Sequence, residues 1–353
     1  MGGMRPALRA GLLPVWRDRD TLQIGVNPRR ATALSGIGAS AAVVGLLDGS
    51  RDWNAIIEAA GNAGVPAEAA RRVLGLLAGA GALADSGARA LSALPAVQRG
   101  RLAPELATAS LAYRDSDGGA RTLARRRAAC VRVHGAGRIG SGVASLLAAA
   151  GIGHVICEDG ETTRPQDLTP AGLGLTELDL PRAHGVARAI ARIAPEVRTG
   201  DDGVRPDLVV LAQIADPGPG AALVRERIPH LAVSAAEAVS VVGPFVSPGR
   251  SACLRCLDLS RAERDPAWPL ILAQLAGAQV EPQACDTVLA AATGALAAAQ
   301  VLLFIDTGRP GSAVTNGTLE LAVPDWQWRR RTWPPHPRCT CACRPSRRGG
   351  TVA

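Results

Sequence analysis

Short apolar runs alternate with segments of helical periodicity along the second part of the chain. Branched aliphatic residues cluster in five runs that we predict to be strands, at residues 131–133, 154–157, 207–212, 230–234 and 240–248. Apolar residues recur at helical spacing between them, at residues 142–150, 181–194 and 221–228. Strands that alternate with helices are typical of βαβ units. The pattern therefore predicts an α/β fold with a Rossmann-like, mostly parallel sheet over residues 128–323.

The first 85 residues follow a different pattern and are predicted to form a separate domain. Two apolar runs, at 12–16 and 21–26, are joined by a polar turn and predict a pair of strands. Three helical patterns and a short strand follow, at residues 37–47, 53–60, 67–80 and 81–85. Asp52 is expected to cap the second helix, and Pro66 marks the start of the third. This order outlines a small winged-helix-like α+β domain, with residues 86–127 as a linker.

A glycine-rich turn follows the first strand of the Rossmann-like part. Gly135, Gly137 and Gly140 form a G-x-G-x-x-G pattern between a strand and a helix, and Asp159 ends the next strand. Such glycines permit a tight turn and let the backbone approach a phosphate, while the carboxylate holds ribose hydroxyls. The pattern predicts nucleotide binding, now or in an ancestor. A turn with a purely structural role is the alternative.

Composition narrows the chemistry. The chain carries a net charge of +8, and all 39 of its basic residues are arginine. Without lysine, P-loop and Schiff-base chemistry are excluded. The positive charge suits nucleic acid or an acidic peptide. No secretory pattern is found, and the alanine-rich apolar run at 286–305 is predicted to be a core helix rather than a membrane span. We therefore expect a cytoplasmic protein.

The eight cysteines indicate metal or thiol chemistry rather than disulfides in a cytoplasmic chain. Cys253 and Cys256 have the spacing of a metal knuckle, and Cys339, Cys341 and Cys343 follow near the C-terminus. Two separated cysteine pairs supply the four ligands of a structural zinc site, although three residues compete for the last two positions. Cys130 and Cys157 lie in predicted strands and are expected to be packing residues. Cys285, at the start of the core helix, is predicted to be buried, with a thiol nucleophile as the alternative.

These motifs together resemble the ThiF/MoeB superfamily, the prokaryotic relatives of ubiquitin-activating enzymes. The resemblance rests on G-A-G-R-I-G followed by A-A-A-G-I-G, and on the strand that runs into Cys253-Leu254-Arg255-Cys256. It implies one structural zinc, which we assign to Cys253, Cys256, Cys339 and Cys341, with Cys343 as a substitute. The zinc would pin the tail, residues 324–353, to the main domain. The resemblance also implies a homodimer and an ATP–Mg²⁺ site with Gly135, Gly137, Arg138, Gly140 and Asp159.

The front domain resembles the PqqD-like peptide-recognition domains of ribosomal-peptide modification enzymes. Its strands, the segment L-L-D-G-S-R, two helices and the final G-A-L carry the resemblance. Such domains hold a leader peptide as an added strand beside a helix. Two alternatives stay open. One is a DNA-binding winged helix, although the third helix offers only Arg71 and Arg72 as readers. The other is a structural or dimerisation module.

The superfamily's adenylation residues are only partly retained in this sequence. Its Asn-x-x-Arg segment corresponds to residues 167–170, where both functional residues are replaced. Arg182 stands where the family has lysine, Asp216 is a displaced replacement for the magnesium-binding aspartate, and Arg138 replaces a small residue in the glycine loop. The resemblance thus implies a protein with eroded adenylation residues that binds a precursor peptide and presents it to a separate modifying enzyme.

Three other functions remain open. The first is an active adenylyltransferase that acts on a peptide or protein C-terminus, with Arg182 and Asp216 as catalytic residues. The second is a DNA-binding regulator, and the third is a redox enzyme with a dinucleotide on the glycine loop. No proton donor for redox chemistry is evident in the sequence, and nucleic acid is disfavoured as a partner.

Overall fold

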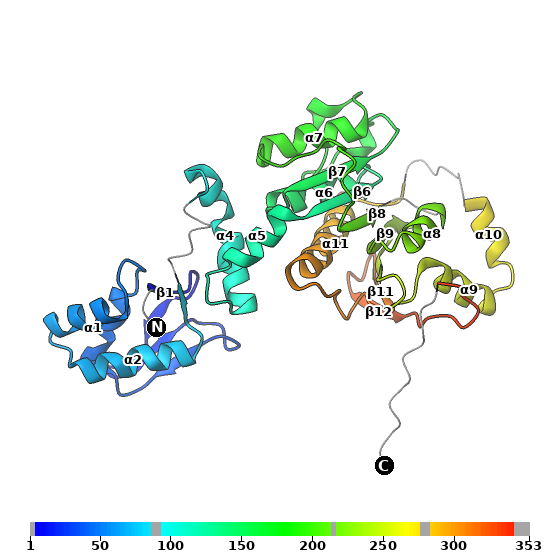
Figure 1. The fold of residues 1–353 in the computed structure, drawn as a ribbon. Coiled ribbons are helices and arrows are strands. Elements are labelled where there is room, and N and C mark those ends of the chain that lie inside the picture. Colours follow the sequence, from blue (N-terminus) through cyan, green and yellow to red (C-terminus); the bar gives the residue numbers. More distant parts are fainter. Residues whose placement is uncertain (1–3, 86–92, 213–216, 276–282, 342–353) are drawn as a thin grey trace, which may run out of the picture. The chain divides into compact units, whose positions relative to one another are not determined.

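The computed structural model describes residues 4–85, 93–212, 217–275 and 283–341. The chain divides into two compact units, Met1–Ala124 and Arg125–Ala353. Figure 1 traces both units along the sequence. Each unit is described by itself below.

The first unit contains two small antiparallel sheets. One has the strand order β2-β3-β4, and in the other β1 pairs with β5. The strands span Pro6–Leu8 (β1), Pro14–Trp16 (β2), Leu22–Ile24 (β3), Thr32–Leu34 (β4) and Leu83–Asp85 (β5). The strands predicted near residues 14, 23 and 83 are confirmed, while β1 and β4 were missed. All five strands have only three residues, so each gives little of the alternation that identifies a strand.

Three helical segments pack on these sheets: the 3₁₀ helix η1 (Gly38–Leu46), α1 (Trp53–Asn62) and α2 (Ala67–Gly79). The predicted cap is confirmed, because the Asp52 side chain accepts a hydrogen bond from the Ala55 N–H at 2.9 Å. The buried core of this unit includes Ile24, Val43, Ile56, Leu74 and Leu77. The apolar faces predicted for the second and third helices point into this core.

Two further helices follow β5: α4 (Ala96–Tyr113) and α5 (Ala120–Ala128). Residues 86–127 were predicted to be a linker, but where they are described they are largely helical. The buried side chain of Arg9 holds the end of α4. Its guanidinium donates hydrogen bonds to the carbonyls of Gly81, Ser110, Arg114 and Asp115 and to the Ser110 hydroxyl. The boundaries of the predicted domains remain a prediction.

The second unit is built on a seven-stranded sheet with the order β12-β11-β10-β9-β8-β6-β7. Strands β7, β6, β8 and β9 are parallel, and β10, β11 and β12 continue the sheet in antiparallel fashion. The strands span Cys130–His134 (β6), His154–Glu158 (β7), Leu208–Leu211 (β8), His230–Ala236 (β9), Val239–Val246 (β10), Gly317–Ala322 (β11) and Trp328–Thr332 (β12). The predicted Rossmann-like α/β fold is confirmed.

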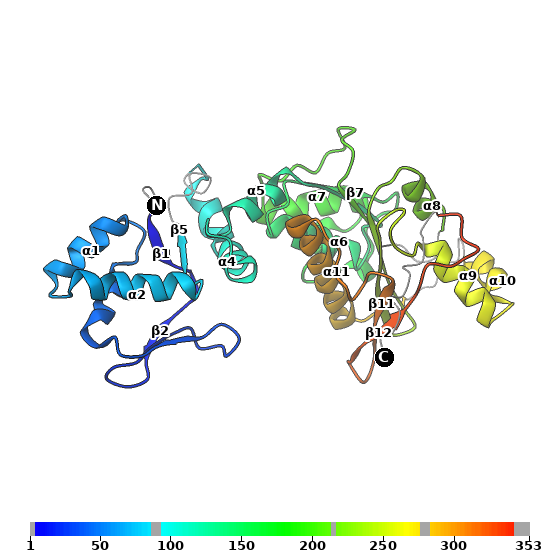
Figure 2. The same cartoon turned by 60° about the horizontal axis from the view of Figure 1, so that its bottom comes forward.

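Helices cover both faces of this sheet. They are α6 (Gly140–Ala149), α7 (Arg182–Ile193), α8 (Pro217–Arg225), α9 (Leu254–Arg264), α10 (Trp268–Leu275) and α11 (Thr287–Thr307). Figures 1 and 2 show α6 and α11 side by side, and both belong to the main core with Leu208 and Val210 of β8. The intervening residues of β8 pack instead with Leu223 of α8. Since alternate residues of a strand face opposite ways, α8 covers the other face.

Helix α11 contains the long apolar run. Among the described residues it is the one helix whose length and composition would let it cross a membrane. Its buried residues, including Leu289, Ala297 and Val301, belong to the main core, and it packs on α6, β9 and β10. The prediction of a core helix is therefore confirmed.

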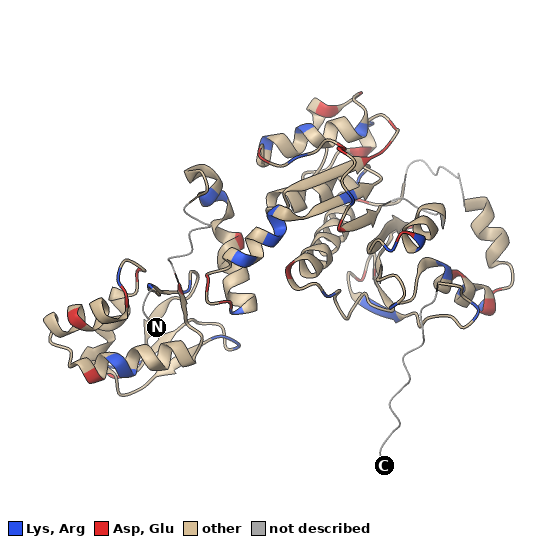
Figure 3. Cartoon of the chain, viewed as in Figure 1, with Lys and Arg blue, Asp and Glu red and all other residues tan. Residues whose placement is uncertain are grey.

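Runs of arginine stand out on α5 and β12 in Figure 3. Several of these arginines are engaged within their own unit. Arg126 pairs with the buried Asp306 at 2.7 Å, and Arg331 lies 3.5 Å from Glu320. Arg330 donates to the carbonyls of Ala313 and Thr315. These arginines thus contribute to the structure of the second unit itself.

Candidate functional site

The glycine loop links β6 to α6 and has the tight geometry that its sequence predicts. Gly135 has a φ of +90°, in the left-handed region that favours glycine. A Cβ atom at Gly140, the first residue of α6, would lie 1.8 Å from the Gly135 carbonyl oxygen. Any larger residue at Gly140 would therefore force the turn open.

Asp159 ties the glycine loop to the end of β7. Its carboxylate accepts hydrogen bonds from the Ala136 N–H at 2.7 Å and the Glu161 N–H at 2.8 Å. The side chain is only 4% exposed. Asp159 is thus placed beside the loop, as predicted for a ribose ligand, but both of its oxygens already accept hydrogen bonds.

Arg182 begins α7, and carboxylates surround its side chain. Its Nε and Nη2 donate to the two oxygens of Asp167 at 2.8 and 3.0 Å. Its Nη1 lies 2.9 Å from Glu161 and 3.6 Å from Asp159. Burial on its own lowers the pKa of Arg182, but the hydrogen bonds and charges of these carboxylates outweigh it and raise the pKa.

Arg138, a residue of the glycine loop, contacts the loop that follows β7 and the start of α11. It donates hydrogen bonds to the carbonyls of Gln166 and Leu168 and to the Thr287 hydroxyl at the start of α11. Its guanidinium therefore holds the loop after β7 against α11. Asp216, the other predicted catalytic residue, lies outside the described residues.

The side chains of Asp167 and Arg182 lie close to Gly137, the middle glycine of the loop. A Cβ atom at Gly137 would lie 3.8 Å from Asp167 Oδ1 and 3.9 Å from Arg182 Nη1. In a dinucleotide fingerprint, this glycine lets the backbone approach the phosphate. As these side chains stand, they do not fit a nucleotide phosphate at Gly137. The predicted nucleotide residues do lie close together, and their role remains a prediction.

A second carboxylate–arginine pair stabilises the segment between β7 and α7. Glu177 is fully buried and accepts hydrogen bonds from Arg192, Thr176 and the Gly174 N–H. The hydrogen bond from Arg192 lowers the pKa of Glu177 from 4.5 to about 2, against the effect of burial. Glu177 therefore stabilises the fold while it is ionised.

This pKa makes the stability of the protein depend on pH. The stabilisation is complete above pH 4.5 and is lost as the pH falls towards 2, because the folded-state pKa is the lower one. We expect the difference in unfolding free energy between the wild type and Glu177→Gln to narrow by about 2 kcal/mol from pH 7 to pH 3. Urea titrations at both pH values measure it. A constant difference would contradict the assigned pKa.

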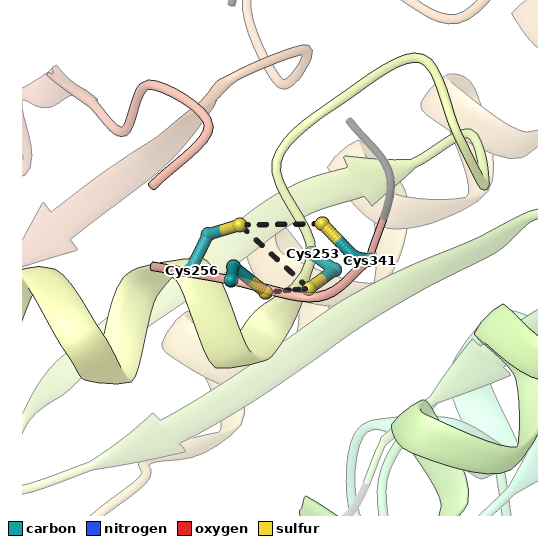
Figure 4. Close-up of side chains that lie close together, drawn as sticks. Cys253, Cys256 and Cys341 are labelled. Carbon is teal, nitrogen blue, oxygen red and sulfur yellow. Dashed lines mark hydrogen bonds between the residues drawn. The ribbon is translucent and has the colours of Figure 1, made fainter. Parts of the chain in front are cut away.

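Four cysteines from two separate segments of the second unit meet in one cluster. Cys253 and Cys256 lie at the start of α9, and Cys339 and Cys341 follow β12. Their sulfur atoms all lie within 4.8 Å of one another (Figure 4). The Cys253 Sγ is 3.8 Å from Cys256 Sγ and 3.7 Å from Cys339 Sγ, and Cys256 Sγ is 3.6 Å from Cys341 Sγ.

These separations fit a tetrahedral zinc ion. Zinc–sulfur bonds of about 2.3 Å place the sulfurs of a tetrahedron about 3.8 Å apart. The thiol of Cys253 donates a hydrogen bond to Cys256, which lowers the pKa of Cys256 and raises that of Cys253. The cluster contains the four residues assigned from the sequence, while Cys343 lies outside the described residues. With four protein ligands, a bound ion would have a structural role.

Trp333 is a residue of this region that the sequence did not single out. It is 1% exposed and packs in one cluster with Cys253, Cys256 and Leu257. Its indole N–H donates to the Thr318 hydroxyl at 3.0 Å, and the Arg261 and Arg331 guanidiniums lie over its ring. The scarcity of aromatic residues, 3% of the chain, is the signal that could have drawn attention to it.

The first unit contains a groove that the sequence did not locate. A cavity of about 340 Å³ lies between the segment after β4 and the N-terminal half of α2. The cavity is lined by Gly36, Ile37, Ser40, Pro66, Glu68, Ala69, Arg72 and Val73. Three of these residues, Ser40, Glu68 and Arg72, have charged or hydroxyl side chains, and the others are apolar or glycine. The groove therefore combines apolar surface with polar groups.

Comparison with known proteins identifies the fold. No family model matches the chain, and no curated protein matches it. Among solved structures, E. coli MccB with AMPCPP and MccA has a TM-score of 0.69 at 15% identity, over 96% of this chain and 99% of that chain. The microcin C7 biosynthetic enzyme MccB in complex with N-formylated MccA gives 0.68 at 16% identity, with the same coverage.

PaaA is a second similar protein, with a TM-score of 0.68 at 14% identity, over 91% of this chain and 98% of that chain. Identities this low carry information on the fold alone. The similarity nevertheless spans almost the full length of both chains. The chain therefore has the ThiF/MoeB-like fold of MccB, as the glycine loop and the paired cysteines had indicated.

Proposed function

We propose that this protein binds a precursor peptide of a ribosomally made, modified product and presents it to a separate modifying enzyme. The leader part of the peptide would lie in the groove of the first unit as an added strand on β4. The observation that carries this proposal is the groove between α2 and the segment that follows β4.

The sheet in the first unit offers an edge for such a strand. Among the described strands, β4 pairs with β3 alone, so one side of its backbone has no strand partner. The groove begins two residues after β4 ends at Leu34. A peptide that extends the sheet gains main-chain hydrogen bonds, and its alternate side chains enter pockets that select the sequence.

The walls of the groove suit a peptide with mixed side chains. Ile37, Ala69 and Val73 offer apolar surface, while Glu68 and Arg72 add one charge of each sign on α2. A DNA backbone would favour arginine and disfavour glutamate at such a surface. The groove therefore supports the peptide over the DNA alternative.

The similar structures agree with a peptide partner. MccB has been solved in complex with MccA, and separately with ATP. We propose that the present chain retains the peptide-binding role and has lost adenylation, because the side chains at its glycine loop pair with one another. Structural zinc at the four cysteines would hold the C-terminal segment to the sheet. The homodimer and the partner enzyme remain predictions from the family resemblance.

A selection experiment tests the proposal. The full chain would be immobilised and presented with a phage library of random 16-residue peptides, and enriched sequences would be synthesised with a fluorescent label. We expect a shared motif with an apolar residue flanked by charged positions. Anisotropy should give saturable binding that an unlabelled copy competes away. Failure to enrich any sequence would overturn the proposal. Unchanged peptide binding in a variant whose groove is filled by a large side chain, such as Ala69→Arg, would also overturn it.

A further inference from the structure

We infer that the Asp167 carboxylate acts as an internal anion that masks a phosphate site at the glycine loop. A phosphate-bearing ligand would bind only by displacing it. This inference concerns the second unit and does not depend on whether the groove of the first unit binds a peptide.

The first step is the position of the carboxylate. Asp167 bonds with both oxygens to the guanidinium of Arg182, in the geometry by which arginine also binds phosphate. Its Oδ1 faces Gly137, 3.8 Å from where a Cβ atom would stand. Asp167 is 5% exposed and also accepts the Arg164 N–H at 2.8 Å, so its side chain is fixed from two sides.

The second step is that a backbone N–H of the glycine loop also donates its hydrogen bond to a carboxylate of the protein. The Ala136 N–H would be available to an anion at this turn, but it donates to Asp159. Two carboxylates thus hold two groups that would otherwise bind a ligand's phosphate. The chain supplies its own negative charges at this position.

The third step is the charge balance. The guanidinium of Arg182 contacts Asp159, Glu161 and Asp167, and that of Arg164 lies 3.9 Å from Glu161, so two arginines face three carboxylates and the cluster has a formal charge of −1. An incoming phosphate would meet this negative charge and would have to break a bidentate ion pair. Removal of one carboxylate should therefore increase the affinity for phosphate rather than decrease it, which is the opposite of what loss of a ligand-binding residue does.

Asp167→Asn provides the direct test. Asparagine has the same shape and keeps an oxygen for the Arg164 N–H, but it cannot hold Arg182 as an ionised partner. Titration calorimetry with ATP–Mg²⁺ should show affinity at least roughly tenfold higher for Asp167→Asn than for the wild type. Adenosine, which lacks phosphate, should show no gain. The double variant with Arg182→Gln should lose the gain.

Glu177→Gln is the matched control. It removes a buried carboxylate from another ion pair in the same segment, but Glu177 pairs with the half-exposed Arg192 and is not among the nearest atoms to the glycine loop. It should leave ATP affinity unchanged.

If circular dichroism shows that Asp167→Asn does not fold, Asp167→Ser replaces it, since a hydroxyl can still accept the Arg164 N–H. Equal ATP affinity in the wild type and the folded Asp167 variant would overturn the inference, as would an equal gain in Glu177→Gln.

Discussion

Replacement of Ala69 by arginine should weaken the binding of a selected peptide by about a hundredfold. Ala69 is half-buried in the wall of the groove, and a long charged side chain at this position would fill the cavity and meet the apolar part of the peptide. Loss of one well-packed anchor in an interface costs about 2–3 kcal/mol, which corresponds to this factor. Fluorescence anisotropy with the labelled peptide measures the dissociation constant.

Ala78→Arg is the control for this experiment. Ala78 lies nine residues further along α2, which places it on the opposite face of the helix, and it is exposed. Both variants add the same charge to the same helix, but only Ala69 lines the groove. Equal weakening by both variants would show that the peptide responds to net charge, and the assignment of the groove would fail.

Replacement of Cys256 by serine should abolish zinc binding and destabilise the second unit. Cys256 is fully buried, and its sulfur is 3.6 Å from that of Cys341, so the cluster loses a central ligand. We expect one zinc per wild-type chain and none in the variant, by elemental analysis. Structural zinc contributes to folding free energy, so urea unfolding should show a loss of at least about 3 kcal/mol.

Cys285→Ser separates loss of the metal from loss of a buried thiol. Cys285 is 5% exposed and belongs to the main core, away from the four clustered cysteines. Zinc should remain bound in this variant. Retention of zinc in Cys256→Ser would contradict the site, and retention in Cys341→Ser alone would assign the fourth ligand position to Cys343.

The parts of the fold that could be predicted depend on local signals. Glycines at 135, 137 and 140 permit the turn, and the apolar run of β8 is buried on both faces, while β6 and β7 bury most of their apolar residues. Asp52 caps α1 through a contact only three residues away. Such features are encoded within a few residues, and so the Rossmann-like sheet could be inferred from them.

The missed features depend on contacts between distant segments. The ion pair of Asp167 with Arg182 forms only because the segment after β7 folds back on α7. No pattern of residues in the sequence predicts this contact. Trp333 becomes a core residue because the cysteine cluster draws the end of the chain onto α9. The groove likewise requires η1 and α2 to pack before its lining exists. The cysteine pairs were the exception, since metal chemistry links them across 83 residues, from 256 to 339.

The contacts of Arg9 decide where the first unit can be cut from the rest of the chain. A fragment that stops at residue 85 would remove Ser110, Arg114 and Asp115 from a guanidinium that is 4% exposed. Four of the five hydrogen bonds of this guanidinium would be lost and only the one to the Gly81 carbonyl would remain, so the end of β1 would lose its connection to α4. An isolated peptide-binding fragment should therefore extend to Ala124, and failure of a shorter fragment to bind peptide would reflect misfolding of the first unit rather than the chemistry of its groove.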